Sequence, residues 1–161
     1  GDIKRPKELH LLWSTGSGHF AGVVRSFGEL GIPSWVHALP YIEDMPGAIV
    51  AADLAVSRAG AMTIAEFLNH GLPAVLVPLP TATENHQEHN ARALEAVGAA
   101  RVVPQRELSP SRLAEEIASM AMDPLSLEQM GMRASERAYP RATQEIAGDV
   151  TTMLSPTRSA A

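Results

Sequence analysis

A glycine-rich segment at residues 15–21 (TGSGHFA) is the first part of the chain that could do chemistry. Gly16, Gly18 and Ala21 fit G-x-G-x-x-A, a variant of the dinucleotide fingerprint in which glycines let the backbone approach a pyrophosphate at a helix N-terminus. An NAD site would also need an acidic residue at the end of the next strand, and the run that ends at Leu39 has none. Two interpretations stay open: a nucleotide-binding loop, or a tight turn in which the glycines serve geometry alone.

The second segment, residues 57–66 (SRAGAMTIAE), combines a small-residue turn with the start of a helix. Free backbone N–H groups near Ala61, Met62 and Thr63 would point at an anion above the sheet. Thr63 and Glu66 also match T-x-x-E, the capping box in which two side chains satisfy helix-end donors and do nothing else. The sequence therefore leaves an anion site and a structural cap as alternatives.

The third segment, residues 78–90 (PLPTATENHQEHN), is a proline-stiffened loop followed by amide, imidazole and carboxylate side chains. Groups that both donate and accept hydrogen bonds suit the hydroxyls of a sugar, although a merely solvated helix start is the alternative. His86 and His89 are three residues apart and could share a helix face, which would suit a metal ion. Their spacing differs from the zincin pattern H-E-x-x-H, so we expect no metal.

Two further histidines lie within apolar, strand-like patterns. His10 falls in the run LHLLWS and His37 in the run SWVHAL. We expect both side chains to be packed core or sheet residues rather than ligands.

Short apolar runs alternate with stretches of helical period along the whole chain. The predicted strands are Leu9–Ser14, Ser34–Leu39, Leu54–Ser57, Ala74–Pro78 and Ala100–Val103. The predicted helices are Phe20–Leu30, Met45–Ala52, Met62–His70, Glu84–Val97, a helix capped by Ser109, and Ser126–Leu154 with an interruption at Tyr139–Pro140.

This alternation predicts the α/β class with a doubly wound parallel sheet. Ligands of such sheets bind beyond the carboxyl ends of the strands. All three segments described above follow a predicted strand, so we expect them to line one edge of the sheet.

Composition excludes several classes of function. The chain of 161 residues has 13 Lys+Arg against 18 Asp+Glu, and this net charge of −5 makes nucleic acid an unfavourable partner. The absence of cysteine excludes disulfides, thiolate metal sites and cysteine nucleophiles. No apolar run approaches the roughly 18 residues that span a bilayer.

Taken in order, three runs resemble a known family. They are TGSGHF (15–20), PYIEDMPGAIVAADLAVSRAGAMTIAEFLNHGLPAVLVPLP (40–80) and ENHQEHNARALEAVGAARVV (84–103). The sequence is similar to the C-terminal, donor-binding domain of the N-acetylglucosamine transferases of peptidoglycan synthesis, which belong to glycosyltransferase family 28 and have the two-domain GT-B fold. The similarity extends from about Leu9 to Val150.

The resemblance implies a site for the nucleoside of UDP-N-acetylglucosamine. Tyr41 falls where the family places an aromatic residue beside the uracil. Ile42 falls where backbone N–H and C=O groups read the uracil edge. Glu66 matches the acid that accepts hydrogen bonds from both ribose hydroxyls, and this match favours the binding interpretation over the capping box.

The resemblance also implies contacts to the diphosphate and the sugar. Ala61, Met62 and Thr63 fall at the helix N-terminus that faces the diphosphate. Gln87 matches a residue that binds the hydroxyls of N-acetylglucosamine, and His86 stands where some members have a second glutamine. Arg58 and Asn90 match motif positions to which the resemblance assigns no contact.

The implied reaction transfers N-acetylglucosamine from UDP-N-acetylglucosamine to the muramyl 4-hydroxyl of undecaprenyl-diphosphate-linked muramyl-pentapeptide, with inversion at the anomeric carbon. It needs no metal or other cofactor, because helix dipoles and backbone N–H groups can hold the departing UDP. In the family, the general base, the acceptor site and the membrane contacts belong to an N-terminal domain. We therefore expect a cytoplasmic protein, peripheral on the inner membrane, with no catalytic residue in this chain.

The resemblance includes one departure. The family's domain opens with a strand and a G-G-S-x-G-A loop, and this chain opens on what looks like the second strand. We expect residues 1–154 to form an N-terminally incomplete UDP-sugar-binding domain, and residues 155–161 (SPTRSAA) a flexible tail. Such a chain should be inactive alone and prone to aggregate through exposed sheet positions.

Two alternatives remain. One is another UDP-sugar enzyme of the same fold, an epimerase or a glycolipid transferase. The other is a non-catalytic module that binds NAD or another nucleotide through Gly16 and Gly18.

Overall fold

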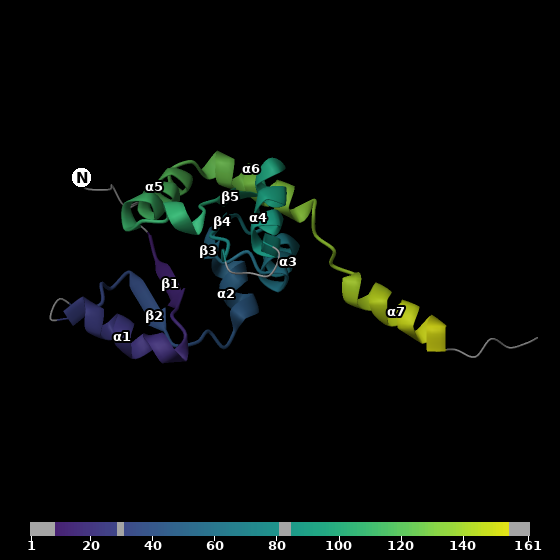
Figure 1. Cartoon of the computed structure of the whole chain (residues 1–161), viewed down its shortest axis with the longest axis horizontal. Helices are drawn as coiled ribbons and strands as arrows, with labels where there is room; N and C mark the ends of the chain where they lie inside the picture. The colour runs from purple at the N-terminus through teal and green to yellow at the C-terminus, as the bar shows by residue number, and fades with distance from the viewer. Residues whose placement is uncertain (1–8, 29–30, 81–84, 155–161) are drawn as a thin grey trace, which may run out of the picture.

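Helices and parallel strands alternate along the chain, as the sequence predicts (Figure 1). The computed structural model describes residues 9–28, 31–80 and 85–154. The strands are β1 (Leu11–Ser14), β2 (Val36–Leu39), β3 (Ala55–Ser57), β4 (Ala74–Leu76) and β5 (Ala100–Val102). The helices are α1 (Ser17–Phe27), α2 (Met45–Ala51), α3 (Ala61–His70), α4 (His86–Ala96), the 3-10 turn η3 (Gln105–Glu107), α5 (Pro110–Ala121), α6 (Pro124–Ser135) and α7 (Ala142–Leu154). The predicted helix ends at Leu30 and Glu84, and the predicted tail 155–161, lie outside the described residues.

The strands form two parallel sheets rather than one. β1 pairs with β2, with Leu11 opposite Val36 and Ser14 opposite Leu39. The second sheet has the order β3-β4-β5. Within the described residues β1 and β3 are each paired along one edge only. The predicted α/β class with parallel strands is confirmed, while its continuity as a single sheet is not observed.

The core is centred on β4, because this strand has a neighbour on each side and helices on both faces. On one face Leu76 is fully buried against Ala91 of α4, with Ile64 and Phe67 of α3 packed around them. On the other face Val75 is fully buried in a cluster that includes Met120 of α5 and Met130 of α6. The buried residues of the first face are Ala59, Ala74, Leu76, Ala91, Ala100 and Val102, and those of the second are Val75, Val77, Val103, Met120 and Met130. Burial of each valine, leucine or methionine side chain in these clusters contributes about 1.5–3 kcal/mol to the free energy of folding.

Side-chain caps explain where several helices begin. Asp44 Oδ1 accepts a hydrogen bond from Gly47 N at 2.9 Å, which starts α2. Ser109 Oγ accepts from Arg112 N at 3.1 Å, as expected from the sequence. Asp123 caps α6 in the same way, so this helix begins at Pro124 and not at the predicted Ser126.

Helix α1 begins three residues before the predicted Phe20. Gly16 has a φ of 81°, a conformation that suits glycine, and turns the chain directly from β1 into the helix. The Gly16 carbonyl accepts the N–H groups of both His19 and Phe20 at 3.0 Å. Gly18 therefore lies inside the first turn of α1.

His37 lies in β2, as expected of a sheet residue, and His10 directly precedes β1. Both side chains are exposed, so packing in the core, the other expected placement, is wrong. His37 Nε2 lies 3.5 Å from His10 Nδ1, and the ring centroids are 5.8 Å apart. The reason is the sparse cover of β1 and β2, where Leu11, Leu12 and Trp13 also keep 39–46% of their surface exposed.

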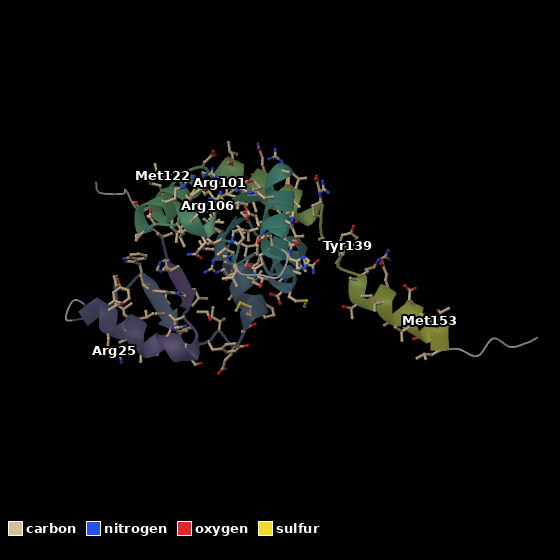
Figure 2. All side chains as sticks on the ribbon, viewed as in Figure 1. Arg25, Arg101, Arg106, Met122, Tyr139 and Met153 are labelled. Atoms are coloured by element: carbon tan, nitrogen blue, oxygen red, sulfur yellow. The ribbon has the colours of Figure 1, made fainter. Side chains whose placement is uncertain are left out.

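Helix α7 extends away from the rest of the molecule (Figures 1 and 2). The chain leaves the helical conformation before Pro140, as predicted, and Tyr139 is 78% exposed. No residue of α7 is buried, and Figure 2 shows Met153 far from the sheets. Within the described residues, no helix has both the length and the apolar character that crossing a bilayer requires.

Candidate functional site

The N-terminus of α3 presents backbone N–H groups that have no acceptor in the described part of the chain. Gly60 is its N-cap, in an extended conformation and without a side chain to cap the helix. The first helical hydrogen bond runs from Ile64 N to the Gly60 carbonyl at 3.0 Å. Among the described residues no acceptor faces the N–H groups of Ala61, Met62 and Thr63. Because these donors lie at the positive end of the helix dipole, they suit an anion.

The capping-box interpretation of Thr63 and Glu66 is wrong. A capping box needs the threonine at the N-cap, but this position is occupied by Gly60, and Thr63 is the third residue of the helix. Glu66 is exposed, and its carboxylate has no hydrogen-bond or ion-pair partner in the described part of the chain. Its two oxygens are thus available to accept hydrogen bonds from a ligand.

The first turn of α4 contacts the loop that follows β4. Gln87 is half-buried, and its Oε1 accepts a hydrogen bond from Leu79 N at 3.0 Å. The amide nitrogen of Gln87 has no acceptor among the described residues and can donate to a hydroxyl group. His86 is the first residue of α4 and is exposed.

The segment between β2 and α2 carries the remaining predicted site residues. Tyr41 is 66% exposed, which leaves its ring free to pack on a flat ligand. Ile42 is half-buried. The cap at Asp44 follows within two residues, and Thr15 holds the end of β2 through a hydrogen bond from its backbone N to the Leu39 carbonyl at 2.9 Å.

These predicted residues follow β2, β3 and β4, at the carboxyl ends of the strands, but no hydrogen bond or ion pair joins the three groups within the described residues. The hollow between α3 and α4, about 250 Å³ in volume, is apolar and includes neither Glu66 nor Gln87. It is lined by Ala61, Ile64, Ala65, Leu68, Asn90, Ala93 and Leu94. The polar groups therefore lie on an open edge of the molecule, outside that hollow.

Metal-binding side chains are not grouped at this edge. Among the residues that the structure describes, no three His, Asp or Glu side chains converge on a point that could hold a metal ion. The donors available to an anion are the backbone groups of α3.

Sequence reasoning missed Gln105, which contacts the segment that leads to α3. The side chain of Gln105 accepts a hydrogen bond from Arg58 Nη1 at 2.5 Å. The two residues are 47 positions apart, so no spacing or motif in the sequence could have paired them.

Comparison with known proteins agrees with this arrangement. Residues 2–146 match the family model described as the glycosyltransferase family 28 C-terminal domain. A relative from Acetivibrio thermocellus is named UDP-N-acetylglucosamine–N-acetylmuramyl-(pentapeptide) pyrophosphoryl-undecaprenol N-acetylglucosamine transferase; it is 43% identical over 89% of this chain and 40% of its own length. A relative of the same name from Carboxydothermus hydrogenoformans is 39% identical over 96% of this chain and 41% of its own. The chain thus spans about 40% of the length of these relatives.

Solved structures show the same fold. The crystal structure of Acinetobacter baumannii MurG aligns with a TM-score of 0.78 and 32% identity, over 90% of this chain and 42% of that one. The glycosyltransferase VinC, in complex with dTDP, aligns with a TM-score of 0.63 over 82% of this chain and 32% of its own, but at 19% identity it supports the fold alone. The similarity that the sequence motifs predict is confirmed: the chain belongs to the glycosyltransferase family 28 C-terminal domain family.

Proposed function

We propose that this chain is the donor-binding part of an inverting glycosyltransferase that uses UDP-N-acetylglucosamine. The transferase would move N-acetylglucosamine to undecaprenyl-diphosphate-linked N-acetylmuramyl-pentapeptide in peptidoglycan synthesis, the reaction for which the relatives are named. The observation that carries the proposal is the start of α3, where three unused backbone donors are followed, one turn later, by the unpaired carboxylate of Glu66.

The nucleotide would lie along the carboxyl edge of the strands. The N–H groups of Ala61, Met62 and Thr63 would receive the diphosphate, and Glu66 would accept hydrogen bonds from the ribose hydroxyls. Tyr41 would pack beside the uracil and the backbone of Ile42 would read its edge. Family membership and the open, polar character of this edge support the assignment.

The sugar would lie toward α4. Gln87 would donate its free amide hydrogens to hydroxyls of N-acetylglucosamine while its Oε1 holds Leu79 N. His86, at the start of the same helix, would add a polar contact on the same side.

In the proposed reaction the acceptor 4-hydroxyl oxygen attacks the anomeric carbon, and the bond from that carbon to the UDP oxygen breaks. The hydroxyl proton passes to a general base, which we place, with the acceptor site, outside this chain. The negative charge that develops on UDP would be stabilised by the donors of α3, with no metal or other cofactor. The intact enzyme would work from the cytoplasm, peripheral to the inner membrane that holds its lipid-linked acceptor.

We also propose that, in the complete sheet, a further parallel strand lies between β1 and β3. Each of these strands is hydrogen-bonded along one edge only in the described part of the chain, and the exposed fractions of Leu12 (46%) and Val56 (43%) are high for strand residues. A strand inserted there would join both sheets into one doubly wound sheet.

Titration calorimetry on the intact protein tests the proposed function, with UDP, UDP-N-acetylglucosamine and NAD as separate ligands. We expect UDP to bind and Glu66→Ala to weaken its affinity about tenfold or more, because hydrogen bonds to a charged group contribute about 1.5–3 kcal/mol. Glu115→Ala is the matched control, since Glu115 is also an exposed helical carboxylate that forms no ion pair with the residues that the structure describes. NAD binding that is lost in Gly18→Val would contradict the proposal, and turnover without a lipid-linked acceptor would favour an epimerase.

A further inference from the structure

Arg58 connects the carboxyl ends of the strands in the three-stranded sheet. It is the first residue after β3, and its Nη1 donates to the carbonyl oxygen of Val77, just beyond β4, at 3.1 Å. The same nitrogen donates to Gln105 Oε1, in η3 beyond β5, at 2.5 Å. One guanidinium group therefore spans from the end of β3 to the segments that follow both other strands.

The residues between Arg58 and α3 are also held by a side chain of α4. Asn90 of α4 donates from Nδ2 to the Ala59 carbonyl oxygen at 3.4 Å. Ala59 has no exposed surface and belongs to the core cluster beside β4. Residues 58–60 are thus fixed by the hydrogen bonds of Arg58, by the amide of Asn90 and by the close packing of Ala59.

This support acts on the donors that begin α3. Gly60 is the N-cap of that helix, and its ψ of 140° sets the direction in which the first turn leaves the loop. A bond rotation at residues 58–60 would reorient the N–H groups of Ala61, Met62 and Thr63 together. Backbone donors bind an anion well only when they are held in place before it arrives, since ordering them on binding consumes part of the interaction energy.

We infer that Arg58 is a positioning residue, braced by Gln105, that holds the first turn of α3 in the orientation that binds the donor's diphosphate. The inference rests on the proposed function and adds to it a role for two side chains that need not touch the ligand. Arg58 suits this role because a guanidinium is always charged and directs several donors from one rigid plane. Its Nη1 is already shared by two protein acceptors.

The affinity ratio between UDP and uridine tests the inference, because only UDP carries the diphosphate. In the intact protein we expect Arg58→Met to weaken UDP binding about tenfold while uridine affinity changes less than about twofold. Gln105→Leu should shift the ratio in the same direction, although Gln105 carries no charge that could attract a phosphate. The matched control is Arg106→Met, because the Arg106 side chain is 72% exposed and, among the residues described, its ion pair is with its neighbour Glu107.

The outcomes separate this inference from the proposed function. If the unmodified protein binds no UDP, the proposed function fails. If it binds UDP and both Arg58→Met and Gln105→Leu keep the original ratio, the positioning role is overturned and the function stands. An effect of Arg58→Met that Gln105→Leu does not share indicates a direct phosphate contact and also overturns it. Thermal melts identify a variant that fails to fold. If Arg58→Met does not fold, the UDP-to-uridine affinity ratio of Gln105→Leu decides, since Gln105 is only half-buried.

Discussion

The carbonyl oxygen of Gly71 lies 2.6 Å from the position that a Cβ atom at Gly131 would occupy. Gly71 ends α3 in the left-handed conformation, with a φ of 62°, and Gly131 lies in the middle of α6. The two helices approach closely here because neither residue has a side chain. This contact fixes the C-terminal end of the helix whose other end carries the unused donors.

Gly131→Ala is expected to destabilise the protein by about 1–3 kcal/mol, because the added methyl group must displace the backbone of α3. Gly22→Ala is the matched control in a helix interior, since a Cβ there meets no atom within 4 Å. That control should be stabilising by about 0.5–1 kcal/mol. Urea unfolding of the intact protein measures both, and equal midpoints for the two variants would rule out the close approach.

Glu116 of α5 pairs with two arginines, Arg101 of β5 and Arg112 of its own helix. Its Oε2 accepts from Arg101 Nη1 at 2.9 Å and its Oε1 lies 2.6 Å from Arg112 Nη2, while its side chain is only 13% exposed. We expect Glu116→Gln to cost about 1–2 kcal/mol of stability, since both partners keep a charge that loses its counter-ion. Glu145→Gln should cost under about 0.5 kcal/mol, because its pair with Arg141 is 64–83% exposed. Denaturant titrations that gave both variants the same cost would contradict this difference.

Gln87 is expected to contribute to binding of the donor's sugar and not of its nucleotide. Gln87→Glu keeps an oxygen for the N–H of Leu79 but loses the amide donors, whereas Gln87→Ala loses both. We expect both variants to weaken UDP-N-acetylglucosamine binding about tenfold and to leave UDP binding within about twofold, because in the proposed arrangement the amide donates to the sugar and not to the nucleotide. Competition binding with the two ligands checks this, and an equal loss for both would place Gln87 against the nucleotide instead.

Asp44 is expected to stabilise the segment that carries Tyr41 and Ile42. Its Oδ1 accepts from Gly47 N at 2.9 Å, so Asp44→Ala should cost about 1 kcal/mol through loss of the α2 cap. Asp44→Asn should restore stability, since asparagine caps a helix about as well as aspartate. We expect uridine affinity to follow the same order. A full loss in Asp44→Asn would show that the carboxylate acts by its charge, and not as a cap.

Much of the fold could be predicted because its signals are local. The unbroken apolar run Ala74–Leu76 indicates a strand with two covered faces, and Ser109 followed by Pro110 marks the start of α5. Helix boundaries were predicted less well where the capping residue lies outside the periodic apolar pattern. Asp123, for example, starts α6 two residues before the predicted Ser126. The division into two sheets could not be predicted, because it depends on which strand edges find a partner and not on any strand's own sequence.

Some features of the candidate site also follow from local sequence, and others do not. The donors of Ala61, Met62 and Thr63 follow from the strand-turn-helix pattern, and the structure removes the capping alternative for Glu66. Motif resemblance assigned no contact to Arg58 and Asn90, whose partners are distant carbonyl and amide groups. Such links come from tertiary packing and have no counterpart in local sequence.

The division of the strands into two sheets also has a consequence for local unfolding and for amide hydrogen exchange. β4 is paired on both edges and packed on both faces, and Ala100 and Val102 of β5 are buried in the same core. The amide hydrogens between these two central strands should therefore exchange with deuterated water only through near-global unfolding. β1 and β2 pair over four residues, and most of their side chains are exposed. Their amide hydrogens should therefore exchange through a local opening that needs much less free energy than global unfolding. The β1–α1–β2 unit would then behave as a separate cooperative unit, labelled in minutes while the central strands stay protected for hours.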